Sequence, residues 1–575
     1  MKFFLESPFF RSRYLVAFVA GLLLTAAYPR IGLPGFAWVA PGIMIAAALG
    51  KRGAEAFRVG FVAGLTHYLS LLYWLLLIPY RWHGLPLAPA LGWLVLSAVL
   101  ALFPAAWVWL VGSGGIASAK APCLGSGPTL SARPCYREED EGISSLPWFG
   151  LLGRNWLGRM LWTVCAAAAW VAFEMIRARV LGGFPWALLG VSQYQMAPLI
   201  QIASVTGVYG VSFVVAWVSL ALLSAGLMVI RRPAARSVWV GEVFLPIVVV
   251  AVLFHIGFRQ IRADAPSPRT LKVLLVQPSI PQSLIWNPNQ DTNRFEQLLL
   301  YSDQALTNGA DLLIWPESAV PKMLRYDKET FNAITRLARR HHVWMIVGSD
   351  DAEPKQKAKD PDAANYFNSS FLITPEGNLA ERYTKRSLVI FGEYVPFERW
   401  LPFLGYFTPV QGGFTPGTRP VEFNLADLDV KTSVLICFED IFPQLGRTDV
   451  LPATDFLVNI TNDGWFGHSA AQWQHATTAL FRAVENQVPL IRCCNNGLTC
   501  WIDARGRLRE ILRDDRRTVY GTAFMRAEIP VLPPGETHRL TFYTRNGDVF
   551  GWGCVGVAAV MLVPKVLPRR RKIET

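Results

Sequence analysis

The sequence predicts two fold classes in one chain, a bundle of membrane-spanning helices followed by an α/β domain. The 575 residues are 52% hydrophobic and only 17% charged, with a mean hydropathy of +0.29, which is typical of membrane proteins. Long apolar segments fill the part of the chain before residue 260. From Leu271 the pattern changes to short apolar runs that alternate with amphipathic stretches, as strands alternate with helices in α/β domains.

The apolar segments predict about eight membrane spans. Several are shorter than the ~20 residues that a span normally needs, so their boundaries are soft. The first follows Arg11 and Arg13 and could also be a cleaved signal peptide, but the series of further spans favours a retained helix. The expected spans are 14–28, 35–50, 60–80, 88–112, 160–178, 205–230, 240–258 and 550–563.

The distribution of Lys and Arg predicts how these spans are oriented. Loops rich in basic residues alternate with loops that contain few, and cytoplasmic loops are the basic ones. The N-terminus is therefore expected in the cytoplasm, and seven spans place the residues after 260 outside it. A basic tail after the last span returns the C-terminus to the cytoplasm. The basic groups are Lys2, Arg11 and Arg13; Lys51, Arg52 and Arg58; Lys120, Arg133, Arg137, Arg154 and Arg159; Arg231, Arg232 and Arg236; and Lys565 with Arg569–Lys572.

These patterns divide the chain into three parts. Residues 1–262 are expected to form an N-terminal bundle of seven spans, and residues 271–530 the α/β domain. Residues 550–566 form the C-terminal span, which is followed by the cytoplasmic tail 565–575. The α/β part has about 260 residues, which is enough for a hydrophobic core of its own.

Within the α/β part, the apolar runs and amphipathic stretches predict individual elements. Strands are expected at 271–277, 311–315, 343–348, 368–374, 431–436, 455–460 and 498–503. Helices are expected at about 291–308, 328–341 and 470–486.

Reactive side chains lie at three of the predicted strand ends. Glu317 follows the apolar run that begins at Asp311, Lys385 precedes another apolar run, and Cys437 ends the run that begins at Val434. A thiol where a buried strand stops abruptly is typical of a nucleophile on a strand-to-helix elbow. Taken singly, a buried structural cysteine, a helix-capping glutamate and a solvated lysine are the simpler interpretations. Together the three residues form an ordered Glu–Lys–Cys set.

This set resembles the catalytic triad of the carbon–nitrogen hydrolase (nitrilase) superfamily, which implies an αββα sandwich for the α/β part. With the eight-span frame, three motifs extend the resemblance to the bacterial apolipoprotein N-acyltransferase family. The motifs are Gly392–Phe397, Cys437–Glu439 and Asn459–Gly467. The chain departs from the family pattern at Ile390, where Pro is common, and at Phe438, where Tyr is common. Both departures concern substrate positioning and leave the triad intact.

The resemblance implies an enzyme that works without a cofactor or metal. Cys437 would be the nucleophile, Glu317 the base, and Lys385 the cation that stabilises the oxyanion. A fatty acyl chain would pass from a phospholipid, expected to be phosphatidylethanolamine, to Cys437 as a thioester. It would then pass to the α-amino group of the N-terminal diacylglyceryl-cysteine of an apolipoprotein, in a ping-pong reaction. The enzyme would lie in the bacterial inner membrane, with its catalytic domain on the periplasmic side.

The resemblance also implies supporting residues. Glu393 is expected to orient the lysine or the base, and Glu439 to hold the elbow and the substrate, although either carboxylate could be purely structural. Trp286 resembles a substrate-contacting tryptophan, but a role in the core is equally compatible with its position. Further candidates for substrate binding or support are Phe438, Tyr394 and Trp465.

An apolar stretch after Glu393 predicts a lid. Residues 400–407 are apolar and aromatic and are flanked by Gly412, Gly413 and Gly417. A soluble enzyme would bury such a stretch, whereas an enzyme supplied from a bilayer could dip it into the lipid. The expected lid residues are Trp400, Phe403 and Phe407.

Other functional classes fit the sequence less well. The net charge of +13 comes from basic residues at the span ends, not beside stacking aromatics, so we expect no nucleic-acid partner. The eight cysteines lack metal-ligand spacing, and the adjacent Cys493 and Cys494 make a poor disulfide pair. Two alternatives stay open: a membrane-tethered amidase that hydrolyses a small amide with the same triad, and a lipid-binding scaffold with a degenerate hydrolase domain. The spans and lid argue against the first, and the complete triad against the second.

Overall fold

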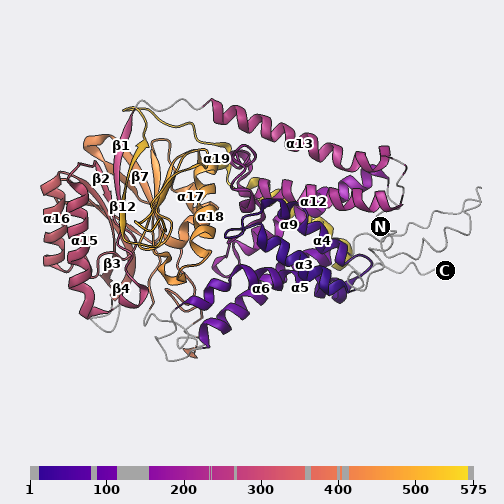
Figure 1. Cartoon of the computed structure of the whole chain (residues 1–575), viewed down its shortest axis with the longest axis horizontal. Helices are drawn as coiled ribbons and strands as arrows, with labels where there is room; N and C mark the ends of the chain where they lie inside the picture. The colour runs from indigo at the N-terminus through magenta and orange to yellow at the C-terminus, as the bar shows by residue number, and fades with distance from the viewer. Residues whose placement is uncertain are drawn as a thin grey trace, which may run out of the picture.

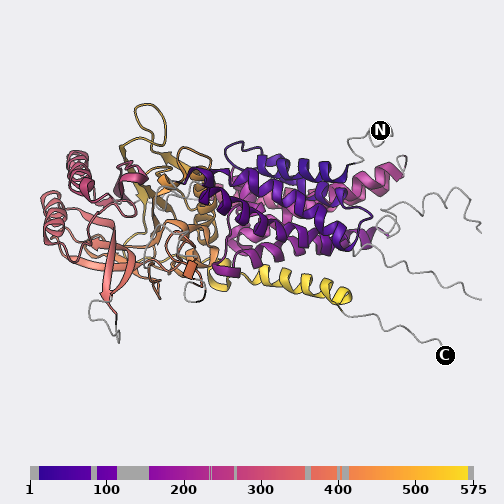
Figure 2. The ribbon, with the colours of Figure 1, turned by 90° about the horizontal axis from the view of Figure 1, so that it is seen from below.

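The computed structural model describes residues 12–78, 87–112, 155–231, 234, 236–263, 269–285, 287–355, 364–397, 400, 402–403 and 413–566. These residues form two parts that lie end to end along the long axis of the molecule (Figure 1). One part is a helical bundle and the other is built on two β-sheets. The view from below shows the same arrangement (Figure 2).

The bundle consists of apolar helices joined by short helical turns. Its main helices are α3 (Arg13–Ala26), α4 (Ala40–Ala47), α5 (Gly53–Leu71), α6 (Ala88–Gly112), α9 (Trp156–Arg177), α12 (Val208–Arg231), α13 (Arg236–Arg262) and α20 (Val549–Val566). The connecting pieces are η1 (Pro34–Trp38), η2 (Tyr73–Leu77), η5 (Val180–Gly182), η6 (Leu189–Gln193), α10 (Ala197–Ile200) and α11 (Ala203–Thr206). Among the described residues, five helices are long and apolar enough to cross a membrane: α6, α9, α12, α13 and α20.

The second expected span, 35–50, is not one continuous helix. It consists of the turn η1 followed by α4, which has eight residues. At 1.5 Å per residue α4 is about 12 Å long, well short of the ~30 Å hydrocarbon core. Pro34 and Pro41 lie in the first turn of η1 and α4, where a missing N–H is tolerated, so each proline favours a new start. The third expected span, 60–80, is displaced: α5 begins at Gly53 and ends at Leu71.

Small residues let α5 and α6 pack closely. A Cβ atom added to Gly64 would lie 2.4 Å from Cγ of Pro104, and one added to Gly60 would lie 2.8 Å from Cα of Ala105. Glycine is therefore required at both positions for the backbones to approach, as is common between membrane helices.

The second part contains two six-stranded sheets. The first has the order β12-β1-β2-β3-β4-β5, and the second has the order β11-β10-β9-β8-β7-β6. The central strands β1–β3 and β7–β9 are parallel, and the outer pairs are antiparallel. The strands are β1 (Thr270–Gln277), β2 (Leu312–Ile314), β3 (Trp344–Pro354), β4 (Ala364–Ile373), β5 (Leu379–Thr384), β6 (Glu422–Leu425), β7 (Val430–Ile436), β8 (Phe456–Thr461), β9 (Leu490–Cys494), β10 (Cys500–Ile502), β11 (Leu508–Ile511) and β12 (Ala523–Pro530).

The two sheets pack face to face and form the expected αββα sandwich. Apolar side chains from both sheets, such as Ile314 and Val434, share one buried core. Helices α15 (Asp291–Leu306) and α16 (Lys328–His341) cover the outer face of the first sheet. Helices α17 (Pro443–Thr448) and α18 (Ala471–Asn486) lie between the second sheet and the bundle (Figure 1). Helix α18 contacts α11 and η6 of the bundle, so the sandwich meets the bundle along this helix.

Candidate active site

Cys437 lies at a strained elbow between β7 and the 3-10 helix η10 (Cys437–Ile441). Its φ angle is +51°, in the left-handed region that residues other than glycine rarely adopt. Such strain persists only where surrounding contacts impose it, and it is concentrated at functional sites. Cys437 is half-buried and packs against the edge of the core between the two sheets, directly after the carboxyl end of β7.

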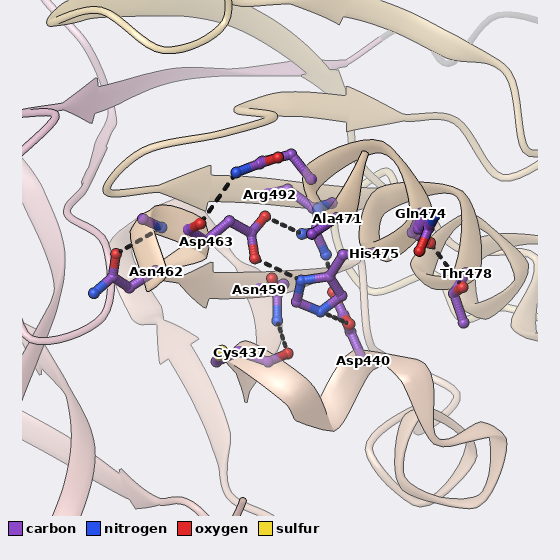
Figure 3. A network of polar contacts seen from close by, with 12 residues as sticks. Cys437, Asp440, Asn459, Asn462, Asp463, Ala471, Gln474, His475, Thr478 and Arg492 are labelled. Carbon is purple, nitrogen blue, oxygen red and sulfur yellow. Dashed lines mark hydrogen bonds and ion pairs between the residues drawn. The ribbon is translucent and has the colours of Figure 1, made fainter. Parts of the chain in front are cut away.

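Side chains on two sides hold this elbow. Asn459 on β8 donates from Nδ2 to the carbonyl oxygens of Leu435 (3.2 Å) and Cys437 (3.0 Å), as seen in Figure 3. On the other side, Oε2 of Glu439 accepts the backbone N–H of Ile436 at 2.7 Å. The turn is thus fixed both before and after the cysteine.

Glu439 also joins the elbow to the segment that carries Lys385. Its Oε1 accepts the backbone N–H groups of Arg386 (2.6 Å) and Ser387 (3.0 Å), and its Oε2 accepts the hydroxyl of Tyr383 (2.8 Å). Burial raises the pKa of Glu439, while these hydrogen bonds favour its charged form. The carboxylate therefore aligns the end of β5 with the end of β7.

Lys385 and Glu317 meet in a buried cluster between the sheets. The Lys385 side chain is 1% exposed, and its Nζ lies 3.1 Å from Oε1 of Glu317 and 2.8 Å from Oε1 of Glu393. Asn368 on β4 donates from Nδ2 to the same two oxygens, at 2.7 and 3.0 Å. Glu393 in turn accepts the backbone N–H of Val389 at 2.8 Å. Glu393 and Asn368 therefore set the positions of both Lys385 and Glu317.

The charges of this cluster act on one another. Burial alone lowers the pKa of Lys385, but the carboxylates of Glu317 and Glu393 outweigh burial and raise that pKa well above its usual value. Lys385 is thus a permanent cation. Burial, followed by the charge of Glu317, raises the pKa of the Cys437 thiol, and Lys385 opposes this effect. The resting thiol is therefore protonated, and it needs a base at the moment of attack.

The remaining sequence-predicted residues fall into two groups. Trp286 and Phe407 lie outside the described residues. The structure describes the other predicted residues. Phe438 packs among aromatic rings, 5.2 Å from Phe442 and 6.0 Å from Phe184 of the bundle by centroids. Tyr394 and Trp465 are partly buried. Trp400 and Phe403 are 82% and 55% exposed.

Sequence reasoning missed several side chains of the site. Asn368 is one of several polar residues in β4, with Asn365, Ser369 and Ser370, and nothing in its sequence context indicates contact with Glu317. A buried group behind the elbow was also missed: Asp440, His475 and Arg492, which join Asp463 of the third motif (Figure 3). The one available signal was Asp440, a second acidic residue directly after Glu439 in a chain segment that is otherwise apolar.

This arrangement is suited to nucleophilic acyl transfer. It presents a thiol at a strained turn, a carboxylate to accept its proton, and a fixed cation beside the place where an oxyanion would develop. Among the described residues, no group of three or more His, Cys, Asp or Glu side chains could hold a metal ion.

The chain is similar to known proteins over nearly its whole length. Residues 272–528 match the family model described as carbon–nitrogen hydrolase, and residues 20–126 and 142–221 match that of the apolipoprotein N-acyltransferase N-terminal domain. A Geobacter metallireducens protein named apolipoprotein N-acyltransferase is 37% identical over 98% of this chain and 97% of that protein. A Vibrio parahaemolyticus protein of the same name is 29% identical over 97% of this chain and 98% of its own length.

Among solved structures, a cysteine-to-alanine mutant of the Nesterenkonia AN1 amidase from the nitrilase superfamily is similar to the sandwich. It is 16% identical, has a TM-score of 0.34, and covers 46% of this chain and 93% of the amidase.

Proposed function

This chain belongs to the apolipoprotein N-acyltransferase family, and we propose that it carries the acyl group of a phospholipid on Cys437 before passing it to a lipoprotein amine. It is an acyltransferase of lipoprotein maturation. One observation carries the assignment of residues: Nζ of Lys385 lies 3.1 Å from Glu317, and Glu439 bonds both to the backbone after Lys385 and to the strand end before Cys437.

The first half-reaction loads the enzyme. Glu317 accepts the proton of the Cys437 thiol as the sulfur attacks the ester carbonyl carbon of the phospholipid. The ammonium of Lys385 and a backbone N–H near Phe438 stabilise the resulting oxyanion. When the tetrahedral intermediate collapses, the C–O ester bond breaks and Glu317 returns the proton to the departing lysophospholipid oxygen. A thioester then links the acyl chain to Cys437.

The second half-reaction transfers the acyl group from Cys437 to the lipoprotein amine. The α-amino group of the diacylglyceryl-cysteine attacks the thioester carbonyl while Glu317 accepts one of the amine protons. The C–S bond breaks as the amide bond forms, and the proton passes from Glu317 to the Cys437 sulfur. The same base and the same cation serve both steps, which is why a single site suffices for a ping-pong reaction. Phosphatidylethanolamine is the donor that we propose.

The membrane arrangement is proposed with the chemistry. The chain is a protein of the bacterial inner membrane, and we place its sandwich on the periplasmic side with both termini in the cytoplasm. Eight passes divide it into residues 1–262, the catalytic part 271–530 and the last span 550–566. In this arrangement the exposed Trp400 and Phe403 form part of a lid at the lipid surface.

Mass spectrometry of the purified protein tests the assignment of Cys437. After incubation with phosphatidylethanolamine, a peptide containing Cys437 is expected to gain the mass of one fatty acyl group. Addition of a diacylglyceryl peptide with a free amine should remove the adduct and yield the N-acylated peptide. Glu317→Gln is expected to slow loading by about 100-fold or more, because a neutral amide cannot take the thiol proton.

Two controls make the result decisive. Cys437→Ala should carry no adduct. Cys494→Ser removes a different cysteine, which is fully buried, and should leave loading unchanged. An adduct on another cysteine, or an active preparation without any adduct, would refute the proposal. Release of free fatty acid or hydrolysis of a small amide without transfer to the peptide would favour the amidase alternative.

A further inference from the structure

Helix α18 lies between the second sheet and the bundle, and it carries an unusual number of buried polar side chains. Its residues are buried from Ala471 to Asn486 apart from the half-buried Trp473. A buried polar group is stable only when it is hydrogen-bonded, so each one on this helix indicates a specific partner. The partners of Gln474 and His475 lie in opposite directions along the molecule.

Gln474 joins α18 to the bundle. Its Oε1 accepts the indole N–H groups of Trp74 at 3.0 Å and Trp186 at 2.9 Å. Its Nε2 donates to the carbonyl oxygen of Pro29 at 2.9 Å. These partners come from three separate segments: Pro29 follows α3, Trp74 lies in η2 and Trp186 follows η5. One amide therefore holds three bundle segments at a fixed position relative to α18.

His475, the next residue, joins α18 to the catalytic elbow. Its Nε2 lies 2.8 Å from Oδ1 of Asp440, and its Nδ1 lies 2.7 Å from Oδ1 of Asp463 (Figure 3). Asp440 belongs to η10, the short helix that Cys437 begins, and Asp463 begins η11 (Asp463–Phe466). All three side chains are at most 2% exposed.

Arg492 adds a buried cation to this group. Arg492 on β9 forms an ion pair with the second oxygen of Asp440, and its other terminal nitrogen lies 3.7 Å from Oδ2 of Asp463. Two carboxylates thus face one guanidinium and an imidazole ring that has both nitrogens against carboxylate oxygens. Buried ion pairs are costly to break, because the partner left behind is an uncompensated charge. The group is therefore a rigid support beneath the elbow.

The bundle also contacts His475 and the catalytic elbow directly. The rings of Trp186 and His475 have centroids 5.4 Å apart, and Phe184 lies 6.0 Å from Phe438, the residue after Cys437. Trp186 therefore contacts Gln474 by a hydrogen bond and His475 by its ring. A shift of the bundle segments at Trp74 or Trp186 would be transmitted to both residues.

We propose that Gln474 and His475 are positioning residues that couple the seating of the membrane bundle to the geometry of the Cys437 elbow. Neither side chain is placed to touch the reacting atoms: Gln474 fixes α18 to the bundle, and His475 fixes Asp440, three residues beyond the nucleophile. This inference rests on the proposed role of Cys437 as acyl carrier. It explains why the membrane domain is part of the catalyst and not only an anchor.

The first test replaces Gln474 by Leu in the full-length protein and measures acylation of Cys437 at several phosphatidylethanolamine concentrations. Gln474→Leu leaves two indole N–H groups without their acceptor. We expect kcat to fall by about 10-fold to 100-fold, as for a small misplacement of a catalytic group, with KM for the donor nearly unchanged. The matched control is Gln193→Leu. Gln193 accepts the indole N–H of Trp38 at 2.8 Å, and its hydrogen bonds stay within the bundle.

The second test separates the two hydrogen bonds of His475. The amide nitrogen of a glutamine can replace Nε2, and that of an asparagine can replace Nδ1. His475→Gln keeps the bond to Asp440 and is expected to retain more activity than His475→Asn, which keeps the bond to Asp463. Equal rates for these two variants, or wild-type kcat in Gln474→Leu, would overturn the proposal. If Gln474→Leu fails to fold, the comparison of the two His475 variants decides.

A third measurement distinguishes failure of this inference from failure of the proposed function. Iodoacetamide alkylation of Cys437, followed by peptide mass spectrometry, reports the exposure and geometry of the thiol without any lipid. The variants should change the alkylation rate while Gln193→Leu does not. Absence of a wild-type acyl adduct together with altered alkylation would refute the acyl-carrier role but support the coupling. A normal adduct in the wild type, with unaltered alkylation and loading in the variants, would support the acyl-carrier role and refute the coupling.

Discussion

Asp350 is a buried carboxylate beside the triad that the proposed reaction does not use. It lies on β3 directly opposite Asn368 of β4, the residue that donates to Glu317 and Glu393. Within the described part of the chain, its Oδ1 atom has no hydrogen-bond partner. Burial, and then the charges of Glu317 and Glu393, raise the pKa of Asp350 to about 7. The charge of Asp350 beside Glu317 and Glu393 therefore depends on pH near neutrality.

The stability effect of Asp350 has a definite sign. An unfolded aspartate has a pKa near ~3.9, so between about pH 4 and pH 7 the folded state binds the extra proton. A state that binds more protons loses stability as the pH rises, so Asp350 contributes a fall in stability across this window. Asp350→Asn removes that contribution. We expect chemical denaturation to show a smaller loss of stability from pH 5 to pH 8 in Asp350→Asn than in the wild type.

A control substitution isolates the effect. Glu353→Gln changes a carboxylate on the same strand that is 43% exposed and paired with Arg382, and it should leave the pH dependence unchanged. Parallel stability curves for the wild type and Asp350→Asn would show that Asp350 is ionised throughout this range in the folded protein.

At the residue scale, the sequence was informative where a reactive group lay directly before or after an apolar run. Glu317, Lys385 and Cys437 follow this pattern, and their order along the chain matched a known triad. Asn368 and His475 follow no such pattern, because they lie inside a strand and inside a helix. Their partners are 51 and 35 residues away, for Glu317 and Asp440, and only the fold brings them together.

At the scale of elements, the amphipathic helices and most buried parallel strands were predicted, but the buried parallel strand β9 was missed. Helices α15, α16 and α18 and strands such as β7 and β8 lie within a few residues of their expected positions. Strand β5 (LAERYT) was missed because it lies at the edge of the first sheet and is largely exposed, so it lacks an apolar run. Lys385 directly follows this strand. Its strand-end position was therefore inferred from the apolar run after it, not from the strand before it.

The segment around Trp400 provides the prediction at this scale. Trp400 and Phe403 are 82% and 55% exposed, although burying such side chains would normally stabilise a protein by about 1.5–3 kcal/mol each. Exposing two large apolar side chains to water costs free energy, so we expect lipid to cover this segment close to Glu393. Replacing both with Ser is expected to slow loading of Cys437 from phosphatidylethanolamine vesicles several-fold, with little change in thermal stability.

A matched control is available on the outer face of the first sheet. Tyr301 on α15 is 41% exposed, and Tyr301→Ser should not affect loading from vesicles. If the double variant loads at the wild-type rate, or if it melts at a much lower temperature, the aromatic segment is not a lipid-facing lid.

At the scale of the whole molecule, contacts indicate which end of the bundle each helix terminus occupies. Pro29 after α3 bonds to Gln474 of the sandwich, and the backbone N–H of Val208, the first residue of α12, bonds to Glu485. At the remote end, Arg13 of α3 donates to the carbonyl oxygen of Leu49 after α4. The ammonium of Lys565 near the end of α20 lies 3.1 Å from the carbonyl oxygen of Trp109 near the end of α6.

These contacts place the C-terminal end of α3 and the N-terminal end of α12 near the sandwich. The N-terminal end of α3 and the C-terminal ends of α4, α6 and α20 lie away from it. This placement fits the eight passes that we propose, in which η1 and α4 together would make one pass. Arg13 and Lys565, which belong to two of the predicted basic groups, lie at the end remote from the sandwich. By the positive-inside rule we expect that end to be cytoplasmic and the catalytic part to be periplasmic.

Cysteine accessibility tests this orientation in a Cys437→Ala background. Glu329→Cys on α16 and Arg52→Cys between α4 and α5 both replace exposed residues, one on the sandwich and one at the remote end of the bundle. With a membrane-impermeant maleimide and intact spheroplasts, Glu329→Cys should be labelled and Arg52→Cys should not. After detergent treatment both should be labelled. Labelling of Arg52→Cys in intact spheroplasts would reverse the proposed orientation, and the lipid and lipoprotein substrates would then have to reach Cys437 from the cytoplasm.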